Sequence, residues 1–424
     1  MRELWKAALV AGLWLAAALL SRSMAHATTQ APLVWLSSGV TFAALGISAR
    51  WAWPPLLAGS ATAAVAWAMG FHQLGVGPAL LFGGIEALSV GLGAWIATLG
   101  RPDPQGPRGV APLISGAVAT SLVGAALATA LWSWLRPGAD LAFESRAWAL
   151  SSVVGILLVA PLVTAFSTFR VRRSGGLPMR PFLGGAAAFL AFIAAVLIVF
   201  SPDAARRWGG VAATLAYVPM PFLLIASLLW GPRGGTLATL VGALLIIERT
   251  AQGGGPFTVQ EGVPGEAVVE VQGFVMTWAV VLLLTRALGE GLRTAWRHAR
   301  EWQLRYERTL QAIGVASVEY DPLSGRATWG AGAARALGTD ATDAGTLEAW
   351  LDRIDPADRG LVQANWHAVA SGQRATSDQA YTLRLSGGRA LLVRERLAAV
   401  TGGDGRVEQV VALLTRVNAE PVHA

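Results

Sequence analysis

Long apolar runs separated by short polar gaps fill the first two thirds of the chain. A membrane-spanning helix needs about 20 mostly apolar residues, and ten runs approach that length. They are 5–20, 33–49, 52–70, 78–98, 111–135, 147–168, 182–200, 209–230, 234–250 and 267–288. The pattern predicts a polytopic α-helical membrane bundle of 8–10 spans, with ten favoured.

The pattern changes where charged residues become frequent, from Glu290 onward. Residues 289–312 carry charges at helical spacing and few apolar positions, so we expect a helical linker. This helix either pairs with its copy in a homodimer or stays solvated.

A small α+β domain is predicted after Gly314. A hairpin with turn residues around Gly325 comes first, then short helices. A longer helix begins with Asp355 as N-cap, Pro356 at its first position and Asp358 in its first turn. Three strand-like runs follow, at 375–385, 389–400 and 406–417.

Charge supports the membrane assignment and sets the topology. Charged residues make up 14% of the chain, against about 25% in soluble domains. With ten spans, most Lys and Arg residues that flank them lie on the side of the N-terminus, as the positive-inside rule requires. We therefore predict a multi-pass inner (plasma) membrane protein whose N-terminus and C-terminal domain are cytoplasmic. The net charge of +7 is spread over loops, so we expect no nucleic-acid partner.

The helix within 354–372, "IDPADRGLVQANWHAVASG", resembles a signature of the PAS domain family. The residues that carry this motif are Asp355, Pro356, Asp358, Arg359 and Trp366. His367 lies broadly where haem-binding relatives place an axial ligand, but the residues around it do not match theirs. We expect a solvent-facing histidine, and we predict no cofactor and no metal.

Four blocks in the apolar half resemble the type-one membrane-associated sensor (MASE) family. They are "VWLSSGVTFAALGISARWAWPPLLAGS" (34–60), "IEALSVGLGAWI" (85–96), "WALSSVVGILLVAPLV" (148–163) and "LLWGPRGGTLATLVGALL" with "GGGPF" (228–257). Ser152 stands where the family usually has Asp, which puts any proton-coupled role of that position in doubt. Relatives often carry histidine-kinase or diguanylate-cyclase output domains after this region.

The chain has neither cysteines nor a recognisable catalytic motif. No phosphate loop, zinc-binding HExxH helix or Gly-x-Ser-x-Gly elbow occurs. We therefore predict that the chain is not an enzyme. Output is expected from a separate kinase, cyclase or response regulator, as in a two-component system.

These observations predict a division into a MASE-type transmembrane sensor domain (1–288), a helical signalling linker (289–312), a PAS-like domain (313–418) and a tail (419–424). The predicted function is relay of a stimulus from the bundle to the PAS-like domain. The alternative is a membrane transporter or channel that the PAS-like domain regulates, because an intramembrane acid and glycine-rich helices also suit transport.

Glu86 is the leading candidate for ligand or proton sensing, because a carboxylate at membrane depth is costly and must have a partner. The competing interpretation is a structural hydrogen bond between helices. Further candidates lie in the family-like blocks or beside the last outer loop: Trp35, Ser38, Trp148, Ser152, Pro161, Glu248 and Glu270.

Overall fold

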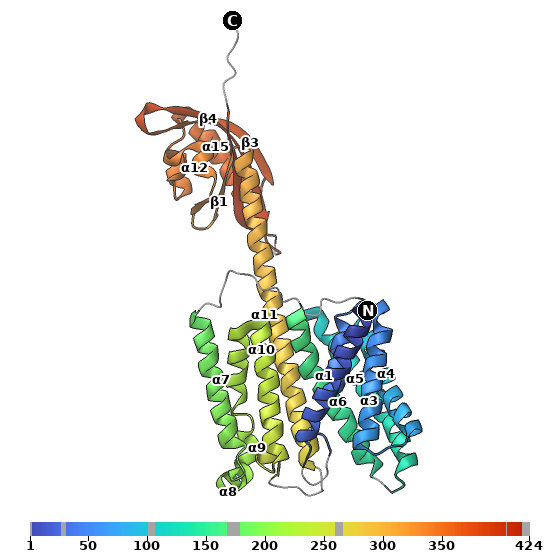
Figure 1. Ribbon diagram of the computed structural model, residues 1–424. Coiled ribbons are helices and arrows are strands. Elements are labelled where there is room, and N and C mark those ends of the chain that lie inside the picture. The colour runs from blue at the N-terminus through green and yellow to red at the C-terminus, as the bar shows by residue number, and fades with distance from the viewer. Residues whose placement is uncertain are drawn as a thin grey trace. The chain divides into compact units, whose positions relative to one another are not determined.

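The computed structural model describes residues 2–26, 31–100, 107–138, 140–167, 179–258, 266–403 and 405–417. These residues form two compact units, Met1–Arg293 and Thr294–Ala424. The first is helical and the second contains a small sheet (Figure 1), which confirms the predicted combination of a helical bundle and an α+β domain. Most of residues 169–180, between two predicted spans, and the whole predicted tail 419–424 lie outside the described residues.

The first unit consists of apolar helices joined by short turns. Its main helices are α1 (Arg2–Ser23), α2 (Leu36–Gly46), α3 (Trp53–Phe71), α4 (Val76–Ala97), α5 (Pro107–Leu135), α6 (Leu141–Ser167), α7 (Met179–Val199), α10 (Met220–Ala251) and α11 (Glu266–Ala312). Short helices connect them: η1 (Arg50–Ala52), α8 (Ala204–Trp208), η2 (Gly209–Val211), α9 (Ala212–Leu215) and η3 (Pro256–Thr258). α11 continues unbroken into the second unit.

Seven of the described helices are long and apolar enough to cross a membrane, namely α1, α4, α5, α6, α7, α10 and α11. Their outward faces are apolar too. α7 is apolar along most of its length, yet less than a third of its most apolar part is buried inside the protein. Leu80, Leu88 and Leu190 are likewise exposed. Side chains of this kind need lipid around them, so the bundle is a membrane protein.

α10 reverses direction at Gly231, whose φ of 68° and ψ of −161° are not helical. A Cβ on Gly235 would lie 2.7 Å from the carbonyl oxygen of Ser227, and one on Gly242 would lie 3.4 Å from Leu223. Residues eight apart in a continuous helix are separated by about 12 Å. The segments 220–230 and 232–251 therefore fold back on each other. The predicted span 209–230 is wrong in its first part, because 209–215 form short helices and the long helix begins at Met220.

The predicted span 33–49 is helical only over α2, which has 11 residues and a length of about 16 Å. Residues 31–35 before it are not helical, so other helices must satisfy their backbone groups. Two helices do this: Ser151 of α6 accepts from the Trp35 amide at 2.9 Å, and Gln272 of α11 donates to the carbonyl of Leu33. Ser21 of α1 accepts from the amide of Leu36, the first residue of α2, at 3.0 Å.

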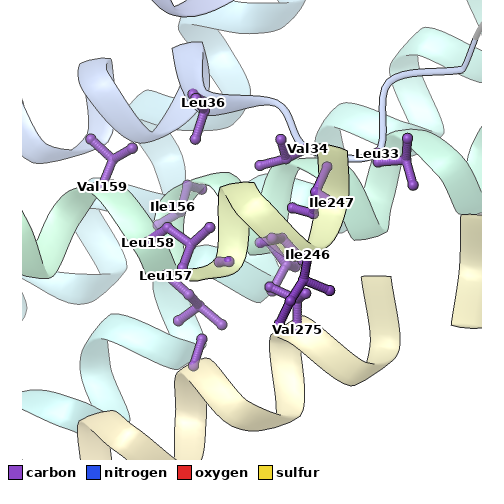
Figure 2. Packing of buried hydrophobic residues seen from close by; sticks show 14 of the residues in the cluster. Leu33, Val34, Leu36, Ile156, Leu157, Leu158, Val159, Ile246, Ile247 and Val275 are labelled. Carbon is purple, nitrogen blue, oxygen red and sulfur yellow. The ribbon is translucent and has the colours of Figure 1, made fainter. Parts of the chain in front are cut away.

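Aliphatic side chains hold the same segment in the bundle core. Figure 2 shows Leu33, Val34 and Leu36 packed with Ile156–Val159 of α6, Ile246 and Ile247 of α10, and Val275 of α11. Close helix contacts are made through glycine. A Cβ at Gly155 would collide with the carbonyl oxygen of Trp35, and one at Gly39 would lie 2.9 Å from the carbonyl carbon of Gly155. Small residues permit this approach of α2 to α6.

The second unit contains a five-stranded antiparallel sheet with the order β2-β1-β5-β4-β3. The strands are β1 (Val315–Tyr320), β2 (Ala327–Trp329), β3 (Thr376–Arg384), β4 (Ala390–Thr401) and β5 (Val407–Arg416). Between β2 and β3 lie α12 (Ala333–Leu337), α13 (Thr339–Thr342), α14 (Leu347–Leu351) and α15 (Pro356–Ala370), and η4 (Ser386–Gly388) joins β3 to β4. The predicted hairpin, helices and three later strands are all present. Trp350, Trp366 and Tyr381 form part of the core.

Candidate functional site

Glu86 lies on α4 and is only 2% exposed. Trp14 of α1 donates its indole N–H to Glu86 Oε1 at 3.2 Å. Ser38 of α2 donates its hydroxyl to the same carboxyl group, with contacts of 3.0 and 3.2 Å to its two oxygens. Three helices thus meet at one carboxyl group whose described partners are neutral. Two of the predicted candidates, Glu86 and Ser38, are thus in direct contact.

Three tryptophans gather beside this carboxyl group. The rings of Trp14, Trp35 and Trp67 are arranged edge to face, with centroids 5.8–6.4 Å apart. Trp14 uses its N–H on Glu86, whereas the buried N–H groups of Trp35 and Trp67 have no hydrogen-bond partner among the described residues. An unpaired buried donor costs about 1–3 kcal/mol. The cluster therefore contains two donors available for another acceptor.

The remaining predicted residues are scattered. The Trp148 ring packs edge to face on Phe82 of α4 at 5.6 Å, so it lies at the border of the tryptophan cluster. Ser152 is buried in α6, but its neighbour Ser151 supplies the carbonyl that binds the Trp35 amide. Pro161 lines a separate cavity.

The two other acidic candidates lie away from Glu86. Glu248 is exposed and accepts a hydrogen bond from Gln252 at 3.1 Å, and Glu270 is exposed on α11. Neither shares a described partner with Glu86.

A route of direct contacts leads from Glu86 to α11. Ser38 binds the carboxyl group from α2, and residues 31–35 precede α2 directly. Gln272 of α11, which is 1% exposed, donates its side-chain amide to the carbonyls of Pro32 and Leu33 at 3.3 and 3.1 Å. Sequence patterns did not single out Gln272. Its only signal was a polar residue inside an apolar run.

In the second unit the cap predicted for α15 is present. Asp355 Oδ1 accepts from the amide of Ala357, and its other oxygen accepts two bonds from the Arg384 guanidinium at 2.9 and 3.1 Å. Pro356 occupies the first turn. Hydrogen bonds to Ala357 and Arg384 hold the pKa of Asp355 below its usual value.

Asp358 and Arg359 bind different partners outside the first turn of α15. Asp358 accepts from the amide of Thr382 on β3, and Arg359 binds Asp352. Trp366 is buried against Tyr320, and His367 is exposed, as expected.

Glu395 is a buried acid that the sequence analysis missed. It lies on β4 between the buried Val393 and Leu397 and is fully buried. A hydrogen-bonded chain connects it to the surface: Arg374 donates to Asn365, Asn365 to Gln379, and Gln379 to Glu395 Oε2 at 2.8 Å. The alternation of "LLVRERL" already placed Glu395 on the inward face, and that signal was available.

Burial is the largest influence on the pKa values of the ionisable groups in the core of the sheet domain. It raises the pKa of Glu395 to about 7, although a hydrogen bond from Gln379 opposes the shift. Burial, and then the nearby Glu395 carboxylate, raise the pKa of Tyr320 and Tyr381 well above the usual value for tyrosine. Both tyrosines therefore remain phenols, and Glu395 is the group of this core that titrates near neutral pH.

Comparison with known families identifies the first unit. The MASE1 family matches residues 6–291, about two thirds of the chain. The chain belongs to the MASE1 family. Membership makes the bundle a membrane-associated sensor domain of signal transduction, and it places the Glu86 site, the tryptophan cluster and Gln272 inside that MASE1 domain.

Other comparisons add little to the MASE1 assignment. No curated protein matches the chain. This chain is similar to a sensory box histidine kinase/response regulator from Burkholderia thailandensis E264, with 19% identity and a TM-score of 0.23. The similar region covers 27% of this chain and 84% of that structure. It is also similar to an RNA-binding light-oxygen-voltage receptor, with 24% identity and a TM-score of 0.22. That similarity covers 26% of this chain and 31% of the receptor.

Proposed function

We propose that this MASE1 protein is a bacterial inner-membrane sensor that relays a stimulus from its bundle to a cytoplasmic PAS domain formed by residues 313–418. A separate kinase, cyclase or response regulator would supply the output. In this proposal the chain crosses the membrane ten times, with α2, α3 and the two segments of α10 each counted as one crossing. Its N-terminus and PAS domain are then on the cytoplasmic side.

The observation that carries the proposal is the route from Glu86 to α11. One carboxyl group is bound by α1 and α2, and the segment before α2 is bound by Gln272. α11 runs without interruption from Glu266 to Ala312, where the sheet domain begins. A change at Glu86 can thus reach α11 through bonded neighbours, and α11 itself extends to Ala312, next to the first strand of the sheet domain.

The tryptophan cluster supports a switch between two packings. Trp14 holds Glu86 in this structure, while the N–H groups of Trp35 and Trp67 are unpaired. In another arrangement, Trp35 or Trp67 would donate its N–H to the Glu86 carboxyl group in place of Trp14, so one hydrogen bond would replace another. Two arrangements of similar energy are what a stimulus needs in order to shift their populations. We propose that the stimulus acts by binding or proton transfer at Glu86.

The linker part of α11 supports the proposed homodimer. Leu292, Trp296 and Tyr306 of α11 are exposed by 61%, 69% and 54%, and they are separated by 4 and 10 residues. These separations match the a and d positions of a coiled coil. A second copy of the helix would cover these side chains.

The test is crosslinking of the tagged full-length protein in cells, followed by mass spectrometry. We expect recovery of a kinase, cyclase or response regulator, and its loss when residues 313–424 are deleted. Glu86→Gln should change the yield of that partner, whereas Glu248→Gln should not. Recovery of only the protein itself and lipid would contradict the partner-docking proposal.

A second candidate is a transporter or channel regulated by the PAS domain. The observation that favours it is the interrupted segment 31–46, because transporters build substrate sites from broken helices. Flux of a small solute in proteoliposomes that Glu86→Gln abolishes would establish this alternative. Absence of flux together with partner recovery would exclude it.

A further inference from the structure

A cavity of about 1310 Å³ opens in the first unit at the end of the bundle where α4 ends and α5 begins. Its walls come from α2, the turn that follows it, α5, α6, α10 and α11. Pockets for drug-sized ligands measure about 300–1,000 Å³, so this space admits a larger molecule. It is distinct from the Glu86 site, because neither Glu86 nor its partners Trp14 and Ser38 line it.

Both arginine side chains and apolar side chains line the cavity. Arg50 and Arg286 contribute positive charge, whereas Arg293 forms an ion pair with Glu290, the acidic residue among the described residues of the wall, at 3.9 Å. Phe42, Trp53 and Leu113 are among the apolar side chains. A ligand that fits both must carry a negative charge at one end and an apolar part at the other.

Arg286 is the best-placed anion ligand. Its Nη2 donates to the carbonyl of Pro232 at 2.9 Å, which fixes the guanidinium, while its buried Nε–H has no partner among the described residues. Guanidinium groups present several N–H donors in a planar fork that suits phosphate. The Nε–H of Arg286 is therefore held in place and can donate to a bound anion.

The reversal of α10 adds a second attraction for anions. The segment 232–251 begins at Pro232, directly after Gly231, and both residues line the cavity. The N-terminal end of a helix carries partial positive charge and attracts phosphate. This helix end and Arg286 meet at the Pro232 carbonyl.

We propose that the cavity binds a phosphate-bearing amphiphile, with the phosphate at Arg286 and Arg50 and the apolar part against Phe42 and Leu113. A lipid headgroup and a soluble phosphate ester share this chemistry. The proposal concerns binding at this cavity, so it stands or fails independently of the relay from Glu86.

The test measures binding to the full-length protein purified in an uncharged detergent. The probes are dihexanoyl phosphatidylglycerol, glycerol phosphate (phosphate without chains) and dihexanoylglycerol (chains without phosphate). Binding is followed by native mass spectrometry and by the increase in melting temperature. We expect dihexanoyl phosphatidylglycerol to bind, dihexanoylglycerol not to bind, and Arg286→Gln to weaken the binding at least tenfold.

Arg146→Gln is the matched control, because Arg146 also bonds a backbone carbonyl but lies near the opposite end of α6 from the cavity-lining Thr164. Arg50→Gln is a second variant if Arg286→Gln does not fold, since Arg50 lies on an exposed turn. Equal, arginine-dependent binding of glycerol phosphate would support the site and identify a soluble ester as its ligand. The proposal is overturned if no probe binds, or if Arg286→Gln and Arg50→Gln bind as Arg146→Gln does.

Discussion

The side-chain amide of Gln272 donates to the carbonyl oxygen of Leu33 at a distance of 3.1 Å, although 239 positions separate the two residues in the chain. The bond ties α11 to a non-helical segment whose backbone has no helix of its own to satisfy it. An equivalent hydrogen bond in water would be replaceable by solvent, but inside the bundle it is not.

Gln272→Leu should lower the free energy of unfolding by about 1–3 kcal/mol, because it leaves the carbonyls of Pro32 and Leu33 unpaired. Thermal unfolding in detergent measures the loss. Gln303→Leu is the control on the same helix, since the Gln303 side chain is exposed and bonds only Glu307 among its described partners. Equal melting temperatures for the two variants would show that the Leu33 contact carries no energy.

Glu86 and Ser38 should be energetically coupled. Glu86→Leu and Ser38→Ala each remove one side of the same hydrogen bonds, and each should cost about 1–3 kcal/mol by leaving a buried polar group unpaired. The double variant should then lose less than the sum of the two, by about 0.5–3 kcal/mol. Additive losses in unfolding measurements on all three variants would refute the contact.

Gly155→Ala should prevent α2 from packing on α6. The new Cβ would meet the carbonyl group of Trp35, which is backbone and cannot rotate away, so we expect a loss of about 1–3 kcal/mol or more. The measurements are the yield of monodisperse protein and its melting temperature. Gly84→Ala on α4 is the control, because nothing lies within 4 Å of its added Cβ, and it should behave like the parent protein.

The stability of the sheet domain should fall as pH rises from about 4.5 to about 7. Folded Glu395 has a pKa of about 7 against an ordinary value of 4.5, so the folded domain binds a proton that the unfolded chain has already lost. The stabilisation is complete below 4.5 and is lost by the time pH has passed 7. One pH unit corresponds to about 1.4 kcal/mol, which makes the total about 3 kcal/mol.

Calorimetry of the full-length protein between pH 4.5 and 8 tests this dependence through the unfolding transition of the domain. Glu395→Gln should flatten it, since an amide keeps the bond to Gln379 but cannot ionise. Glu348→Gln, at an exposed position, should leave the slope unchanged. A slope that persists in Glu395→Gln would assign the effect to another group.

Asp355→Ala should destabilise the sheet domain by about 1–2 kcal/mol. It removes the N-cap of α15 and the paired bonds from Arg384 together. Asp352→Ala removes a surface ion pair with Arg359 at 3.4 Å and should cost less than about 1 kcal/mol. Chemical denaturation of both variants gives the comparison, and a larger loss in Asp352→Ala would contradict it.

Regular elements were predictable because their signals are local. Apolar runs marked the long helices, and alternation marked β3, β4 and β5. The cap at Asp355 followed from residue type and spacing alone. Glu86 was predictable as well, since an acid in the middle of a long apolar run has few alternatives to a buried, bonded position.

What escaped prediction depends on contacts between distant segments. The run 33–49 looks uniformly apolar, yet residues 33–35 are not helical, and Ser151 and Gln272 from two other helices bond their backbone groups. The cavity beside Arg286 depends in the same way on where α10 turns. Neither relationship leaves a periodic trace in the sequence.

The turn at Gly231 bears on how the protein enters the membrane during synthesis. The segment 220–230 has 11 residues and is about 16 Å long as a helix, roughly half of the ~30 Å hydrocarbon thickness. Alone it is too short to span the hydrocarbon region as a helix, but it packs against 232–251 as an antiparallel hairpin, so we expect the two segments to insert together. A side chain at Gly231 would strain a φ of 68°, so we expect such a variant to insert and fold less efficiently.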